Sequence, residues 1–504
     1  MSTSGMLEVE RKYDVNDDDQ WPALASLPGV DRLGPPEEES LDAVYFDTAG
    51  LDLASHRITL RRRTGGRDAG WHLKLPVAVG ERQEFTAPLG TDSQAVPRRL
   101  RQLVRVHTRE LDLIPVARLK TRRTVQRLFA ADGSALAEFS DDRVDSQTLL
   151  EPKAHANWRE WEIELVDGPK RLLKSADSLV AAAGHHRSAL PSKLARGLGG
   201  QYPPGNSVAQ EAEPKGPASA VFLAYLSQQV EALKKHDPGV REDSPDAVHQ
   251  LRVAARRMRS ALATFRSLTD PATAGSLRSE LQWLAGAVGE ARDNEVMRDR
   301  VLGLITSEPP ELVLGPVAEQ AEEHFSRDAR AARAKGLAAL NSARYFRLLD
   351  ALDAFLAEPP LTDTAAKDAV RTVGRLVSKE RKRLKKEVAA LDVDPADPTL
   401  DAALHEVRKS AKRLRYAAES SAPIFGKRAT TLARAAEEIQ ESLGDHHDSV
   451  VTRDLLRKLA AEDAGANAFT YGRLHAMEQQ AGEEARERFF RTWSTSPPEP
   501  LSWK

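Results

Sequence analysis

The chain has 504 residues, too many for one compact core, so we expect two or three domains. It contains no cysteine, which excludes disulfides, thiolate metal sites and a cysteine nucleophile. The net charge is only −2, so binding of an anion would depend on local placement of cations rather than on a basic chain. The sequence has no apolar run of about 18 residues and no secretory signal, so we expect no membrane partner and a cytoplasmic location.

The first 200 residues alternate polar and apolar side chains with a period of two, which predicts β-strands separated by Gly, Pro and Asp turns. Strands of this kind bury their apolar face and keep the other face polar, which favours an antiparallel barrel. The segments with this alternation are residues 7–15, 58–64, 71–77, 116–128, 135–142 and 158–168.

Charged residues follow the same alternation. In LEVERKY, Glu8, Glu10 and Lys12 are spaced by two and therefore share one strand face, and REWEIEL repeats this with Glu160, Glu162 and Glu164. If the apolar parity is the outer, covered face, the charges line a barrel lumen; a solvated strand face is the alternative. Oxygen ligands without thiolates suit Mg²⁺ or Mn²⁺. The bases with the predicted inward parity are Arg61, Arg63, His72, Lys74, Arg82, Arg118, Lys120 and Arg122.

One strand allows two assignments. In VARLKTRRT either Arg122 or Arg123 can project inward, and the alternation of its apolar residues favours Arg122.

Residues 201–216 are rich in Gly, Pro and Ser and predict a linker between a first domain, 1–200, and a second, 217–504. Beyond the linker the hydrophobic period changes to 3.6, which predicts an all-helical domain. The fold class is therefore multidomain α+β, with a barrel followed by helices.

The helical domain contains an internal repeat. VHQLRVAARRMRSA and LHEVRKSAKRLRYA align His249 with His405, 156 residues later, and the following segments align Gly289 with Gly444. This duplication predicts two bundles related by a pseudo-twofold axis, with the two basic helices facing a shared surface.

The cations of the two basic helices border an apolar seam, Leu251 to Phe265 in the first copy and Val407 to Ala418 in the second. A solvated basic face is the simple interpretation, but two copies at the same phase favour a long polyanion. Only 5% of the residues are aromatic, so stacking on nucleic-acid bases is disfavoured and bare phosphate is favoured. The predicted polyphosphate-binding residues are His249, Arg252, Arg256, Arg257, Arg259, His405, Arg408, Lys412, Arg413 and Arg415.

The first domain resembles the CYTH family, the triphosphate tunnel metalloenzymes, in its E-x-E-x-K at residues 8–12, its R-x-R at residues 61–63, its acidic strand at 160–164 and SKLARGL at 192–198. The resemblance implies a barrel that holds a metal-bound triphosphate, with Glu8, Glu10 and Lys12 as catalytic residues. It implies a metal set of Glu8, Glu10, Asp142, Glu162 and Glu164. It implies triphosphate binding by Lys12, Arg61, Arg63, Lys74, Arg82, Arg118, Lys120, Arg122 and Lys193.

The second domain resembles the CHAD family over residues 217–491, in its two His/Arg repeats and its later Gly/Asp segments. That family binds inorganic polyphosphate. The two domains together resemble CYTH plus CHAD proteins that act as inorganic triphosphatases, which implies tripolyphosphate and polyphosphate as partners and association with polyphosphate granules. The alternatives are a non-catalytic polyphosphate-binding protein, a CYTH-type adenylate cyclase and a thiamine triphosphatase.

Overall fold

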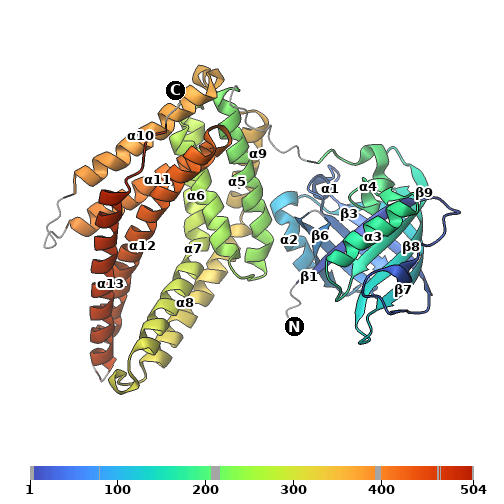
Figure 1. Cartoon of the computed structure of the whole chain (residues 1–504), viewed down its shortest axis with the longest axis horizontal. Coiled ribbons are helices and arrows are strands. Elements are labelled where there is room, and N and C mark those ends of the chain that lie inside the picture. Colours follow the sequence, from blue (N-terminus) through green and yellow to red (C-terminus); the bar gives the residue numbers. More distant parts are fainter. Residues whose placement is uncertain are drawn as a thin grey trace. The chain divides into compact units, whose positions relative to one another are not determined.

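The computed structural model describes residues 5–78, 80–92, 94–205, 216–391, 399–462, 465 and 467–501, and it divides into two compact units, 1–207 and 208–504 (Figure 1). Most of the predicted linker lies outside the described residues, at 206–215. Each unit has its own fold.

The first unit is a closed antiparallel barrel of eight strands, as the alternation of the sequence predicts. Closure comes from β1 (Met6–Val15), which pairs with β6 on one edge and with β9 on the other, where Glu10 lies opposite Glu164. Two short strands, β2 (Arg32–Leu33) and β10 (His186–Arg187), add to the ends of β7 and β1. The order continues from β1 through β6 (Glu81–Ala87), β5 (Gly70–Ala78), β4 (Thr59–Thr64), β3 (Glu37–Asp47), β7 (Ile114–Phe129), β8 (Ala135–Thr148) and β9 (His155–Leu165).

Two helices cover apolar parts of the outer face of the barrel. Helix α2 (Arg98–Thr108) buries Leu100 and Leu103 against a cluster that includes Trp71, and α3 (Arg171–Ala182) buries Leu173 against a cluster that includes Trp161. Burial of these outward-facing side chains stabilises the barrel by roughly 1.5–3 kcal/mol for each large one. The opposite parity of the same strands is thereby left to line the lumen.

Helix α4 (Lys193–Leu198) packs against inward-facing residues of the barrel. Ser192 caps this helix, because its hydroxyl accepts a hydrogen bond from the Ala195 amide at 3.1 Å. Leu194 belongs to the same buried cluster as Leu119 and Val144, which both have the inward parity. One section of the lumen is therefore apolar, and the polar section adjoins it at Lys193.

The second unit is all-helical. Helix α9 (Ala343–Ala357) contributes Tyr345, Leu349 and Phe355 to its core. The first unit has one more short helix, α1 (Asp52–Ser55). Within the described residues, no helix is both long enough and apolar enough to cross a membrane. The main helices are α5 (Ala218–Arg241), α6 (Ala247–Thr264), α7 (Pro271–Ser307), α8 (Val317–Leu340), α10 (Ala369–Ala389), α11 (Leu400–Phe425), α12 (Lys427–Glu462) and α13 (Asn467–Thr495).

The duplicated halves meet around equivalent positions. The two basic helices, α6 and α11, pack against each other, and their predicted seams are buried, with Met258 and Leu414 fully enclosed. Met297 of α7 and Thr452 of α12 occupy corresponding positions of the repeat. The Thr452 hydroxyl donates a hydrogen bond to the Met297 sulfur at 3.4 Å. Contact between equivalent residues is what a pseudo-twofold axis requires, so the predicted arrangement of the two bundles is confirmed.

Candidate functional site

Charged side chains from six of the eight strands, from the β4–β5 turn and from α4 converge in the barrel lumen. Residues spaced by two on β1 share a face, which is why Glu10 and Lys12 both reach this cavity. The cavity is lined by Glu10, Lys12, Tyr45, Thr59, Arg61, Arg63, Asp68, Lys74, Arg82, Glu84, Arg123, Glu162, Glu164, Ser192 and Lys193. Most of the predicted lumen residues are thus brought together, and Glu8 lies beside them, bonded to Lys74 and only 2% exposed.

Lys12 and its acidic neighbours form a buried ion cluster. The Lys12 ammonium lies 2.5 Å from Glu10 Oε1 and 2.7 Å from Glu162 Oε1. Burial would raise the pKa of Glu10, but the charges of Lys12, Lys74 and Arg82 together outweigh it and hold the pKa at about 2. The pKa of Glu162 also lies well below its ordinary value, since cations that include the Lys12 and Lys193 ammonium groups outweigh the effect of burial. Both acids are therefore ionised at neutral pH.

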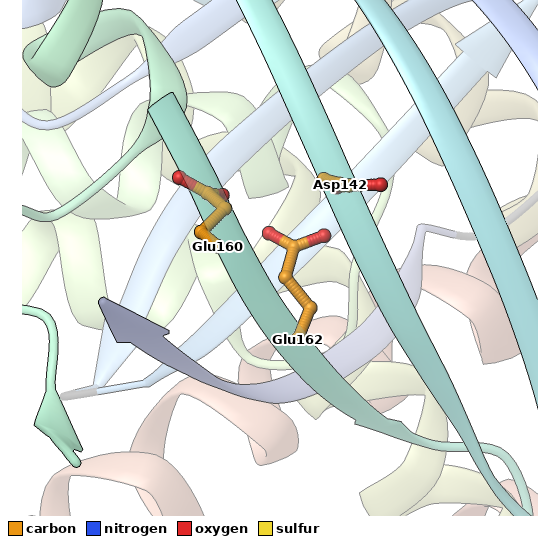
Figure 2. Close-up of side chains that lie close together, drawn as sticks. All are labelled: Asp142, Glu160 and Glu162. Carbon is orange, nitrogen blue, oxygen red and sulfur yellow. The ribbon is translucent and has the colours of Figure 1, made fainter. Parts of the chain in front are cut away.

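Three buried carboxylates, Asp142, Glu160 and Glu162, have oxygen atoms within 4.8 Å of one another, a spacing at which they could hold a metal ion (Figure 2). The Lys193 ammonium already contacts all three, at 2.9, 2.7 and 2.5 Å respectively. Arg123 forms a two-pronged pair with Asp142, at 2.7 and 2.6 Å. A cation at this trio would have to displace Lys193, and the predicted metal ligand Asp142 is also held by Arg123.

Glu8, Glu10 and Glu164 form a second acidic group, on the paired strands β1 and β9. Glu10 and Glu164 lie directly opposite each other on β1 and β9, and Glu8 precedes Glu10 by two residues on the same face of β1. Burial and the nearby Glu8 carboxylate raise the pKa of Glu164 to about 7, which shows that negative charge is crowded here. Hard oxygen ligands with excess negative charge match the preference of Mg²⁺ and Mn²⁺.

The prediction that Arg118, Lys120 and Arg122 line the lumen is wrong. These three side chains lie on the outer face of β7, where all three are exposed and Arg118 pairs with Asp42 at 2.5 Å. The neighbouring residue, Arg123, projects inward instead. The parity is reversed because the apolar residues between these bases face α4 inside the barrel, whereas the bases themselves are exposed on the outer face.

Several lumen residues carry no role in the sequence prediction, among them Tyr45, Asp68 and Glu84. The Arg61 guanidinium donates to the Tyr45 hydroxyl at 3.4 Å. Burial would raise the pKa of Tyr45, but Arg61 together with Lys193 and Lys74 lowers it. Glu84 has the same strand parity as Arg82, so the alternation signal was present for it. Asp68 lies in a turn, where no alternation exists to reveal it.

His72 also has a defined place. Its Nε2 donates to the backbone carbonyl of Asp68 at 2.8 Å, and its Nδ1 lies 2.9 Å from Glu84 Oε1. Burial lowers the pKa of His72, and the Arg61 and Arg63 guanidinium groups lower it further. This histidine therefore links the turn after β4 to the wall of the lumen.

In the second unit, each basic helix lays an arginine across a glycine of the following helix. Arg252 donates to the Gly289 carbonyl at 3.3 Å and to Asp293 at 2.6 Å. A Cβ on Gly289 would lie 2.8 Å from the Arg252 guanidinium carbon, and one on Gly444 would lie 3.4 Å from Arg408 Nη2. The aligned glycines of the repeat thus make room for aligned arginines.

Four cations gather where the two basic helices meet. Burial, together with the charges of Arg408, Arg256 and Arg252, lowers the pKa of Lys412 to about 7. Nearby, the His405 ring lies 4.5 Å from the His447 ring, and burial lowers the pKa of both histidines. A cluster that suppresses its own protonation is stabilised by a bound anion.

Besides Arg252, which pairs with Asp293, two of the predicted polyphosphate ligands already pair with carboxylates. Arg257 and Arg415 pair with Glu419 at 3.0 and 2.8 Å, and Arg415 also pairs with Glu437 at 2.8 Å. Arg259 and Arg413 form a different group: burial lowers the pKa of each, and each also lies within the field of Arg278. His249 lies near Arg256. Burial lowers the pKa of His249, and the Arg256 charge lowers it further.

Comparison with known proteins places both units. Residues 6–198 match the CYTH domain, and residues 224–457 match the CHAD domain. The chain is 40% identical over 501 residues to "Uncharacterized protein Rv2226" of Mycobacterium tuberculosis (strain ATCC 25618 / H37Rv), a match that covers 96% of this chain and 94% of that protein.

Two solved structures are also similar. PptA from Streptomyces chartreusis is 25% identical, covering 55% of this chain and 100% of its own, with a TM-score of 0.47. The CHAD domain from the plant Ricinus communis is 27% identical, covering 59% of this chain and 94% of its own, with a TM-score of 0.42.

Proposed function

The chain belongs to the family of proteins in which a CYTH domain precedes a CHAD domain, and from this premise we propose that it is a metal-dependent inorganic triphosphatase that also binds polyphosphate. The first unit would hydrolyse a phosphoanhydride bond of tripolyphosphate or short polyphosphate. The second unit would bind long chains. The observation that carries the proposal is the lumen itself, where cations able to hold phosphates face crowded, buried carboxylates.

The cations of the lumen differ in how freely they can meet phosphate. Lys12, Arg123 and Lys193 are paired with carboxylates, so they hold the acids in place and would share their charge with a substrate. Within the described residues, Arg61 and Arg82 form no ion pair with a carboxylate, and they are therefore the first candidates to bind phosphate oxygens. Lys74 and Arg63 complete the proposed triphosphate-binding set.

The proposed metal ligands are Glu8, Glu10, Asp142, Glu162 and Glu164, and a metal would replace the Lys193 ammonium at Asp142 and Glu162. A bound Mg²⁺ or Mn²⁺ would neutralise phosphate charge and orient a water for in-line attack. The chain itself fixes the terminal phosphoryl group through its guanidinium and ammonium groups and excludes bulk water by burying them. Glu8, Glu10 and Lys12 stay the proposed catalytic residues, because they lie at the junction of the acidic and basic walls.

The lining of the cavity favours an inorganic substrate over a nucleotide or thiamine triphosphate. Its described residues include one aromatic side chain, Tyr45, and no aliphatic one, so the cavity lacks a surface on which adenine or thiamine would pack. The adenylate cyclase and thiamine triphosphatase alternatives are therefore second to hydrolysis of inorganic chains.

For the second unit, the proposed ligands of polyphosphate are Arg252, Arg256, Arg408 and Lys412, with His249, His405, Arg259 and Arg413 extending the surface. Tyr416 is an aromatic side chain near them. The guanidinium carbons of Arg257 and Arg415 both lie 5.8 Å from the centre of its ring, so these arginines cover the ring and leave little of it open to a base. This supports bare phosphate rather than nucleic acid as the partner. A cytoplasmic location with association with polyphosphate granules belongs to the same proposal.

The test is phosphate release from tripolyphosphate, long polyphosphate, ATP and thiamine triphosphate, each with Mg²⁺, Mn²⁺ or Ca²⁺. The proposal expects fastest release from tripolyphosphate and loss of release when the metal is chelated. Release of pyrophosphate with cyclic AMP from ATP would favour the cyclase. No turnover of any substrate, with retained polyphosphate binding, would favour the non-catalytic alternative.

A further inference from the structure

The turn between β4 and β5, residues 65–69, places a carboxylate in the tunnel. Asp68 lines the lumen and forms an ion pair with Arg63, whose side chain is only 5% exposed. The Asp68 side chain is 60% exposed, so this acid lies at the open side of the cavity, unlike the buried acids of β1 and β9. A phosphate that enters to meet Arg63 therefore encounters Asp68 first.

The structure holds this carboxylate in place from both sides. His72, which is 3% exposed, donates from Nε2 to the Asp68 carbonyl, and Glu84 holds the other ring nitrogen. The turn also depends on Gly65, which has φ +78° and whose Cβ would lie 2.0 Å from the Ser40 carbonyl oxygen. The position of Asp68 is thus fixed by buried contacts of its backbone.

A carboxylate on a guanidinium occupies the same donors that a phosphate would use. We propose that Asp68 is a positioning and specificity-determining residue of the tunnel, which competes with substrate and product phosphates for Arg63. A polyphosphate substrate that also contacts the other cations of the lumen displaces Asp68 from Arg63. A short product makes fewer contacts, so Asp68 displaces it from Arg63 and the product dissociates. This inference rests on the proposed triphosphatase function.

The consequence is a separation of KM from kcat. With Asp68→Asn, Arg63 is released, and we expect the KM for tripolyphosphate and the inhibition constant of pyrophosphate to fall about fivefold, the upper range for a partly exposed ion pair. The kcat should stay within about twofold. Asp68→Glu, which keeps the charge, should restore values close to those of the natural protein.

Two controls separate this role from a general change of charge or fold. Asp42→Asn removes a carboxylate that pairs with Arg118 on the outer face, and it should leave both constants unchanged. In an Arg63→Ala background, Asp68→Asn should have no further effect. An unchanged inhibition constant in Asp68→Asn, or a decrease that persists without Arg63, would overturn the inference.

Calorimetric binding of pyrophosphate and tripolyphosphate separates this inference from the function on which it rests. The full chain carrying Arg252→Ala, Arg256→Ala, Arg408→Ala and Lys412→Ala would be used, so that the second unit contributes little binding. Tighter binding by Asp68→Asn in a chain that hydrolyses nothing would support the role of Asp68 while the triphosphatase fails. Hydrolysis with equal affinity in both proteins would refute the role of Asp68 alone.

Discussion

Arg122 and Arg123 are neighbours with opposite surroundings. Arg122 is exposed on the outer face of β7, whereas Arg123 reaches the lumen and bonds to Asp142 and Glu162. In an extended strand, adjacent side chains point to opposite faces, so a wrong parity reverses every assignment along the strand. Lys120 and Arg118 were misplaced together with Arg122 for that single reason.

This pair provides a matched test of the lumen. Arg123→Ala leaves Asp142, which is fully buried, with Lys193 as its cation, and it removes a candidate phosphate ligand. We expect kcat/KM for tripolyphosphate to fall about 100-fold, the size seen when one stabilising donor is lost. Arg122→Ala should change kcat/KM by less than about twofold. Equal losses in the two variants would contradict the assigned faces.

Lys412 predicts how polyphosphate binding depends on pH. Its pKa of about 7 means that the amine is only partly protonated in the free protein at neutral pH. A polyanion favours the protonated form, so binding takes up a proton and becomes tighter as the pH falls from about 8 to about 6.5. Lys412→Gln should weaken binding and flatten this slope, as fluorescence titration with labelled polyphosphate would reveal. An unchanged slope in the variant would assign the effect to other groups.

At the scale of elements, the contact between each basic helix and the helix that follows depends on a missing side chain. Gly289 lies inside α7, where glycine is a poor helix former, yet its lack of a Cβ is what admits the Arg252 guanidinium. The same device recurs with Gly444 and Arg408 in α12. The glycines of the repeat therefore make room for the arginines of the proposed phosphate-binding surface.

Gly289→Ala should accordingly separate stability from binding. Because the new methyl would displace the Arg252 guanidinium, we expect polyphosphate affinity to fall about three- to tenfold, with no loss of thermal stability. Gly286→Ala, in the same helix with open space at its Cβ, should raise stability by about 1 kcal/mol and leave affinity unchanged. Thermal unfolding and a binding titration on both variants measure these effects. Equal affinities would show that the position of Arg252 is unimportant.

Strands and helices were predictable from the sequence where one period dominates. The alternation in β1 and β9 correctly predicted which acids share a face, and the seam of α6 was correctly predicted as core. The prediction failed for β7, since α4 packs inside the barrel and makes the apolar parity the inner one. The packing of α4 is a long-range contact, which a local period does not encode. The lumen position of Asp68 could not be predicted for a related reason, because the residues of a turn have no hydrophobic period.

At the scale of the whole molecule, the change of period after residue 200 indicated two units, and the chain divides at 207/208. Each unit has its own core and its own cations, so the two proposed activities should be separable by substitution. The repeat also predicted the pseudo-twofold axis, because equivalent residues of a duplicated fold occupy equivalent places.

The quadruple variant Arg252→Ala, Arg256→Ala, Arg408→Ala and Lys412→Ala tests this separation. We expect it to lose retention on immobilised long polyphosphate by at least about 100-fold, because four clustered charges are removed, while turnover of tripolyphosphate changes by less than about twofold. Circular dichroism would verify that the helices are intact. Loss of both activities in a folded variant would indicate a single phosphate site that involves both units.

The most direct measurement of the central claim is phosphate release from tripolyphosphate with Mg²⁺ or Mn²⁺ by Glu10→Gln, compared with Glu38→Gln, an exposed residue of β3. Because Glu10 holds Lys12 and is a proposed metal ligand, we predict a loss of turnover of about 1000-fold with retention on long polyphosphate unchanged. Glu38→Gln should match the natural protein in both assays. Turnover by Glu10→Gln at the rate of the natural protein would contradict the account of the tunnel.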